Sequence, residues 1–182
     1  DGTATRGSPK PKMKRMPVGP PKLTSEGLIK WAGSGSISES AFKAYLEAHH
    51  SAASFADRRG LTVLHSLCTN PKFSEMNVRT YLSAHPSHAK DAECLSEDGR
   101  TPLHCIAGNR ASTLAAVKLV LQFSPSALNV ADDSGKTPLI YAREREVEMG
   151  GDEVSASCFR LLLASSVTAE RDPATKNNQL HQ

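Results

Sequence analysis

The sequence has few aromatic residues and no long apolar run. Aromatics make up 5% and hydrophobic residues 38% of its 182 residues, so a core must be built from Leu, Ala, Val and Ile. This composition favours packed small helices over aromatic-rich strands. The longest apolar cluster, Val117–Phe123, is interrupted by Lys118 and Gln122 and is shorter than the ~20 residues of a membrane span. We therefore expect a soluble protein.

Cysteines are few and far apart, and the sequence has no CxxC pair. Zinc sites usually contain closely spaced ligand pairs, and the spacing of His65 and Cys68 has no second pair to accompany it. We expect no metal site, and reduced core thiols in the cytoplasm or another reducing intracellular compartment. An organelle reached after removal of a presequence is the alternative. The cysteines are Cys68, Cys94, Cys105 and Cys158.

Common catalytic and phosphate-binding motifs are also missing. There is no GxSxG, no HExxH and no evident carboxylate pair, and the stretch "GSGS" at residues 33–36 lacks the third glycine of a phosphate loop. Cys105 follows His104 directly, but neighbours on a helix point in different directions and do not form a dyad. We expect a protein that is not an enzyme and binds no cofactor.

Two patterns repeat along the chain. The first is "DRRGLTVLHSLC" from Asp57, "SEDGRTPLHCIA" from Ser96 and "DDSGKTPLIYAR" from Asp132, whose threonines recur at intervals of 39 and 36 residues. The second is an apolar segment at 42–53, 78–89, 117–128 and 158–169. Two interlocked patterns of nearly constant period indicate stacked supersecondary units.

Each residue type in the repeated string has a physical reason. Glycines 60, 99 and 135 follow polar turn residues, where a positive backbone angle reverses the chain. The threonine two residues later caps a helix, and Pro102 or Pro138 fits its first turn because the missing amide has no helical partner. The predicted unit is a hairpin turn, a helix, a tight turn and a second helix.

These units resemble ankyrin repeats, whose hallmark is a DxxGxTPLHxAA string in a unit of about 33 residues. The resemblance covers about residues 38–166 and implies an all-α fold: an ankyrin-type α-solenoid of stacked helix-turn-helix repeats with projecting turns. Ser96, Val63 and Ile140 depart from the string, and the longer spacings imply insertions between or after helices. In such repeats His65 and His104 tie adjacent turns by hydrogen bonds.

We divide the chain into three parts. Residues 1–37 are expected to form a basic Pro/Gly-rich extended arm with a short segment around Trp31, and residues 38–170 the repeat domain. In that domain, residues 38–50 are a half-repeat cap. Residues 171–182 are expected to be a polar C-terminal tail. Trp31 is either a lid on the repeats or an anchor for another protein, and both interpretations stay open.

The arm differs from the rest of the chain in charge. Residues 1–30 contain seven Lys or Arg against two acidic residues, whereas the remainder contains fifteen against seventeen. Three interpretations stay open: a solvated terminus or presequence remnant, a polyproline ligand, or an electrostatic arm for nucleic acid or an anionic surface. The basic cluster of the electrostatic arm would be Lys10, Lys12, Lys14 and Arg15.

The resemblance also implies where a partner would bind, because the variable turn positions of the family carry partner specificity. The charges there are mixed, which favours a polypeptide over a nucleic-acid duplex. We therefore predict a protein-protein interaction module, an adaptor or assembly subunit; the alternatives are a ribosome- or nucleic-acid-associated component using the arm, or the regulatory part of an enzyme. No homo-oligomer is implied. The predicted partner-binding residues are Trp31, Arg58, Arg59, Leu61, Asn70, Glu97, Asp98, Arg100, Asn109, Asp133, Ser134, Lys136 and Glu144.

Overall fold

Helices follow one another in pairs along the chain of the computed structural model, which describes residues 24–49 and 55–171. The pairs are α1 (Ser25–Gly33) with α2 (Glu39–Ala48), α3 (Val63–Thr69) with α4 (Glu75–Ala84), α5 (Pro102–Gly108) with α6 (Leu114–Phe123), and α7 (Pro138–Glu148) with α8 (Glu153–Arg171). The described residues contain no strand. The predicted all-α, ankyrin-type stack is therefore confirmed.

The helices begin where the sequence provides capping side chains. Thr24, Ser38, Ser74 and Thr113 have extended backbone angles, and the side chain of each accepts a hydrogen bond from an amide in the first turn of its helix. Pro102 and Pro138 are the first residues of α5 and α7, where a missing amide costs nothing. The repeated threonines 62, 101 and 137 are the N-cap residues of α3, α5 and α7. The Thr62 hydroxyl accepts from the His65 amide at 3.4 Å, whereas the Thr137 side chain makes no capping hydrogen bond.

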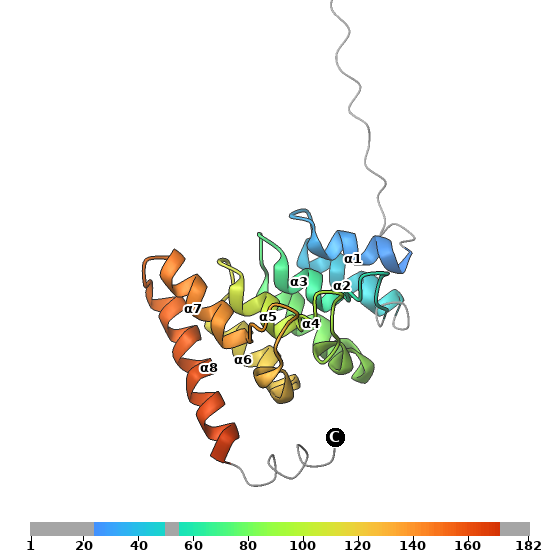
Figure 1. The fold of residues 1–182 in the computed structure, drawn as a ribbon. Helices are drawn as coiled ribbons and strands as arrows, with labels where there is room; N and C mark the ends of the chain where they lie inside the picture. The colour runs from blue at the N-terminus through green and yellow to red at the C-terminus, as the bar shows by residue number, and fades with distance from the viewer. Residues whose placement is uncertain (1–23, 50–54, 172–182) are drawn as a thin grey trace, which may run out of the picture.

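The pairs stack into two rows (Figure 1). Helices α1, α3, α5 and α7 form the first row, in which each contacts the next, and α2, α4, α6 and α8 form the second row in the same way. The core lies between the rows and contains Leu64, Leu103, Val117 and Leu162, each 0% exposed. Each pair therefore buries its apolar face against its neighbours, as expected for a repeat array.

The stack includes a helix that the sequence analysis assigned to the arm. Helix α1 contacts α3, and its residues Leu28 and Ala32 are 0% exposed. Helices α1 and α2 thus form a complete pair at this end of the stack, where the sequence suggested a half repeat starting at residue 38.

The insertions that the long spacings predicted are short helices. The 3-10 helices η1 (Pro86–Ala92) and η2 (Pro125–Asn129) follow α4 and α6 and lead into the next turn. At the turn between α7 and α8, Gly150 and Gly151 have φ angles of 68° and 74°, a conformation that favours glycine. Among the helices of the described residues, none is both long and apolar enough to cross a membrane.

Candidate functional site

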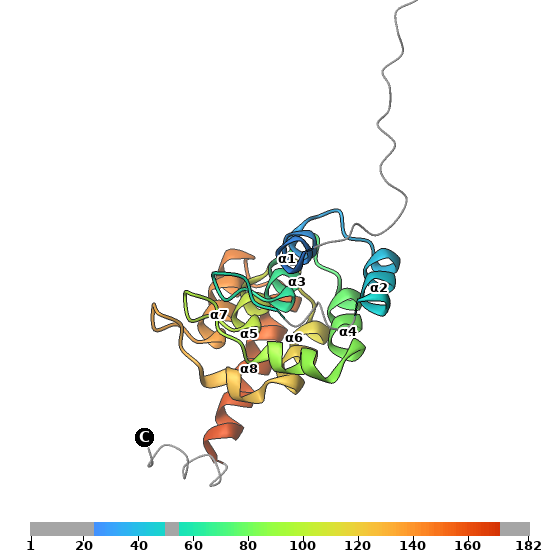
Figure 2. The same ribbon diagram turned by 90° about the vertical axis from the view of Figure 1, so that its right-hand side faces the viewer.

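Three turns line up along one edge of the stack, and we call them the turn ladder: residues 57–61, 96–100 and 132–136 (Figure 2). Each turn is closed by the same backbone hydrogen bond, for example from the Ser96 amide to the Arg100 carbonyl at 2.9 Å. Successive turns are joined by further bonds: the Glu97 amide donates to the Arg59 carbonyl at 2.7 Å, and the Asp133 amide to the Asp98 carbonyl at 3.1 Å. The ladder is therefore a continuous hydrogen-bonded structure.

Two glycines permit this close approach. A Cβ atom on Gly60 would lie 2.5 Å from the Leu95 carbonyl oxygen, and one on Gly99 would lie 2.7 Å from a carboxylate oxygen of Asp133. Gly135, in the last turn, has no atom within 4 Å of its would-be Cβ. The first two glycines are therefore needed both for the positive φ angle and for contact with the next turn.

Histidines connect each turn to the next, as the resemblance implied. In the first repeat, His65 Nδ1 accepts from the Thr62 amide at 3.2 Å, so the proton of the neutral ring lies on Nε2, which donates to the Arg100 carbonyl at 3.0 Å. His104 repeats this arrangement with Thr101 and the Lys136 carbonyl, at 3.1 Å each. Burial lowers the pKa of both imidazoles, which keeps them neutral.

A second set of bonds connects the far ends of the first-row helices. The Asn70 side-chain amide donates to the carbonyls of Ala32 and Ser34 at 2.8 and 2.9 Å, and Asn109 donates to the carbonyls of Cys68 and Asn70 at the same distances. Asn70 is 2% exposed. These two predicted partner-binding residues thus have their amide groups bonded within the fold.

The third residue of that set is Arg145, not Glu144. Asn70 and Asn109 each lie eight residues after the capping threonine, and the residue eight after Thr137 is Arg145. Arg145 is 2% exposed, and its guanidinium donates to the hydroxyl and carbonyl oxygens of Ser112 at 2.7 and 3.0 Å. Glu144 is exposed and pairs with Lys136 at 2.5 Å.

Most of the remaining predicted residues lie in the turn ladder. Leu61, Arg100 and Lys136 are half-buried, and the others are exposed. Their charges partly pair along the ladder: Arg59 Nε lies 3.9 Å from Glu97, and Arg100 Nε lies 3.6 Å from Asp132. The Arg59–Glu97 pair is exposed and contributes little stability, so its charges stay available to a partner, whereas the Asp132 side chain is only 1% exposed. The exposed residues are Arg58, Arg59, Glu97, Asp98, Asp133 and Ser134.

Trp31 lies on α1 and packs against α2 of the second row. Its ring makes edge contacts with Phe42 and Tyr45, with centroids 6.0 Å away in each case. The side chain is half-buried, so in the structure it covers part of the core. Lys10, Lys12, Lys14 and Arg15 lie outside the described residues, as does most of the expected C-terminal tail.

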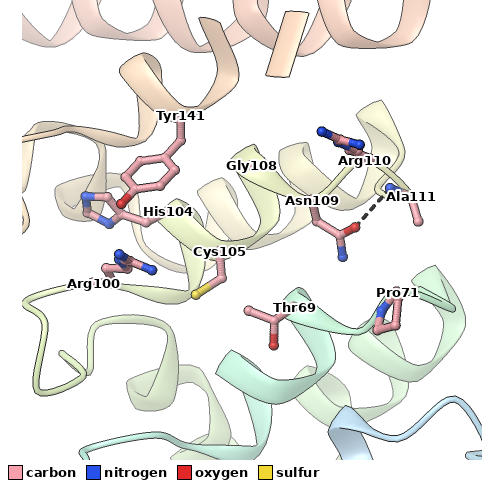
Figure 3. Close-up of a pocket in the computed structure, with 10 residues that line it drawn as sticks. All are labelled: Thr69, Pro71, Arg100, His104, Cys105, Gly108, Asn109, Arg110, Ala111 and Tyr141. Atoms are coloured by element: carbon pink, nitrogen blue, oxygen red, sulfur yellow. Dashed lines mark hydrogen bonds between the residues drawn. The ribbon is translucent and has the colours of Figure 1, made fainter. Parts of the chain in front are cut away.

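The first-row face also contains a groove that sequence reasoning missed (Figure 3). It has a volume of about 470 Å³ and is lined by the ends of α3 and α5 and by α7. The lining includes Pro71, Arg100, Cys105, Arg110 and Tyr141, and contains no acidic residue. Of the predicted partner-binding residues, Arg100 and Asn109 line this groove. Tyr141 follows Ile140 in the altered third string, where an aromatic residue gave no signal of its own.

Nothing in the described residues suggests activation of a nucleophile. Burial raises the pKa of the Cys105 thiol to about 12, and it also raises the pKa values of Cys68, Cys94 and Cys158, whereas reactive cysteines have lowered values. No group of three or more His, Cys, Asp or Glu side chains in residues 24–49 and 55–171 could hold a metal ion.

Comparison with known proteins agrees with this geometry. A family model described as ankyrin repeats, with three copies, matches residues 77–177. Calmodulin-binding transcription activator homolog 1 of Caenorhabditis elegans is 41% identical over 56 residues. Those residues are 31% of this chain but 5% of the relative, so the similarity concerns a small part of that protein.

Proposed function

Because the chain belongs to the ankyrin repeat family, whose repeats generally mediate protein-protein interaction, we propose that it is a non-enzymatic adaptor or assembly subunit. It binds a partner protein through the turn ladder and the first-row face of the stack. The observation that carries this proposal is the ladder itself: exposed charged side chains project from turns that backbone hydrogen bonds hold in register.

A surface of this kind suits recognition because little is left to order when a partner binds. The His65 and His104 bonds fix each turn against the next, so binding does not have to immobilise the backbone. Preorganisation of this kind improves affinity by reducing the entropy lost on association. The arm, through Lys10, Lys12, Lys14 and Arg15, adds a tethered second contact that raises the effective concentration.

The test compares proteins recovered by the intact chain and by two double variants. Arg58→Ala with Arg59→Ala removes two exposed charges from the ladder, and Lys43→Ala with Lys118→Ala removes two exposed charges from the second row. We expect the first variant to lose proteins that the intact chain and the second variant both retain, as identified by mass spectrometry. Identical sets from all three would refute the assignment of the ladder as the binding surface.

A second candidate function rests on the charge of residues 1–30, which contain seven basic and two acidic residues. Such an arm is suited to the phosphates of a nucleic acid. The test is deletion of residues 1–22, followed by RNA and DNA binding over a range of salt concentrations. A steep salt slope that disappears with the deletion would favour this function over protein binding.

A further inference from the structure

The groove on the first-row face differs in charge from the turn ladder beside it. The ladder carries both signs, whereas the groove is lined by two arginines, Arg100 and Arg110, and by no acidic residue. His104, which also lines it, has a pKa lowered by burial and adds no charge at neutral pH. The charged side chains that line the groove are therefore all basic.

Arg100 has unused capacity to bind an anion. Its Nε is buried and has no hydrogen-bond partner in the part of the chain that the structure describes. The nearest carboxylate, Asp132 Oδ2, is 3.6 Å away and already accepts a hydrogen bond from the Tyr141 hydroxyl at 2.7 Å. An Arg side chain offers five donors in a planar fork that matches a carboxylate. The Arg100 side chain is 42% exposed, so a ligand carboxylate would bind its terminal Nη groups and not the buried Nε.

Arg110 lies at the opposite end of the groove. It pairs with Glu148 at 2.9 Å, and the two side chains are 66% and 54% exposed. An exposed pair of this kind contributes little and exchanges partners readily. Helix α5 separates the two arginines, and its seven residues rise by about 10 Å.

Apolar and aromatic surface lies between the two charges (Figure 3). The Tyr141 ring has the Arg100 guanidinium carbon 5.5 Å from its centroid, and a Cβ on Gly108 would lie 3.2 Å from its Cδ1. The missing side chain at position 108 thus lets the ring pack against α5. Pro71 and Cys105 complete this part of the lining.

From this juxtaposition we propose that the groove binds an extended acidic peptide segment of the partner protein. One carboxylate pairs with Arg100, an apolar side chain packs on Tyr141, and a second carboxylate pairs with Arg110. An extended chain rises about 3.3 Å per residue, so the two acidic residues are three or four positions apart. The inference rests on the proposed function and names the partner chemistry at one part of that surface.

The experiment uses the full chain and fluorescein-labelled synthetic peptides. Each peptide contains two glutamates separated by one, two, three or five intervening residues. One intervening residue is leucine and any others are alanine. For each peptide, a matched control has glutamine in place of both glutamates. We expect the tightest binding, by fluorescence anisotropy, for two or three intervening residues. The matched glutamine peptides should bind at least about tenfold more weakly, since a charge-assisted hydrogen bond is about twice as strong as a neutral one.

Variants assign the binding to the groove. Arg100→Gln should weaken binding about tenfold, which is the usual effect of losing one charge-assisted contact, and Arg110→Gln should weaken it less because Glu148 already occupies that guanidinium. Arg100→Lys keeps the charge but loses the fork, and should fall in between. Arg79→Gln on α4, whose arginine pairs with the half-buried Glu75, should bind as the intact chain does. Far-UV circular dichroism checks that each variant is folded.

The proposal is overturned if glutamate and glutamine peptides bind alike, or if a folded Arg100→Gln variant binds as tightly as the intact chain. Either result leaves the proposed function standing, because recovery of proteins through the ladder charges Arg58 and Arg59 is a separate measurement. The converse result is specific binding of the peptides together with recovery of the same proteins by the ladder variant and the intact chain. That result would support the groove as a binding site and refute the assignment of the ladder as the binding surface.

Discussion

At the scale of single residues, Gly99 and Gly135 have nearly the same backbone conformation but different surroundings. Their φ angles are 72° and 74°, so alanine would be strained at both positions. Only the Cβ at position 99 would meet the next turn, where the Asp133 amide lies 3.1 Å from it. At the end of the ladder, glycine is therefore required only for the positive φ angle. Inside the ladder it is required for the positive φ angle and for the close contact with the next turn.

This difference predicts unequal effects of the same substitution. Gly99→Ala should destabilise the protein by about 1–3 kcal/mol more than Gly135→Ala, since overpacking adds to the backbone strain that both variants share. Urea unfolding of the two variants measures the difference. If both variants lost the same free energy of unfolding, the turns next to position 99 would be able to separate enough to accommodate a Cβ without further loss of stability.

The buried histidines predict a pH dependence of stability. Burial holds the pKa values of His65 and His104 below the usual 6.5 in the folded chain, so below that pH the unfolded chain binds protons that the folded chain does not. Stability should be full above about pH 6.5 and decrease as the pH falls below it. Urea unfolding between pH 8 and pH 5 measures this slope.

The control for that slope replaces both histidines by glutamine, which retains a donor and an acceptor but does not titrate. The double variant should be less stable at pH 8 and should lose less further stability down to pH 5. A slope unchanged by the double substitution would assign the pH dependence to other groups.

At the scale of elements, side chains that bond to the ends of helices join one pair to the next. Asn70 connects the turn after α1 to the end of α3, and its carbonyl oxygen accepts from the Lys72 amide at 2.8 Å. This contact helps to join α1, which carries no ankyrin string, to the first row, where Leu28 and Ala32 are also buried. It was not evident from the sequence because it depends on two segments 38 residues apart.

Loss of this link should loosen α1 before the rest of the stack. Asn70→Ala leaves a buried carbonyl without a donor, which costs about 1–3 kcal/mol. Trp31 lies on α1, so its fluorescence should change at a lower urea concentration than the far-UV circular dichroism. Asn129→Ala, at an exposed position in η2, is the matched control. In this variant the fluorescence and circular dichroism transitions should occur at the same urea concentration. Separate transitions in the control would argue against a specific role of Asn70.

At the scale of the whole molecule, stability depends on neighbouring pairs because each pair buries its apolar face against the next. Leu103 is 0% exposed on α5, between the α3 and α7 helices of the first row. Leu103→Ala should cost about 2–5 kcal/mol and should also shift the unfolding midpoint reported by Trp31 on α1. The control is Leu163→Ala, at a 42% exposed position of α8, which should have little effect on stability. If Leu103→Ala left the unfolding midpoint reported by Trp31 unchanged, the array would not unfold as one cooperative unit.

The sequence by itself determined the helical repeat, the start of each first helix after α1, and the positions of the turns, because these follow from local chemistry: a glycine at positive φ, a capping threonine and a proline at the first position. It also led to the ladder residues through Arg58, Glu97 and Asp133. Only the tertiary structure decided that Asn70 is buried, that the Arg145 guanidinium bonds to Ser112, and that Arg100, Arg110 and Tyr141 meet at one groove. Those outcomes depend on contacts between segments more than 30 residues apart, and a local pattern carries no information about which side chains the stacking of helices will bring together.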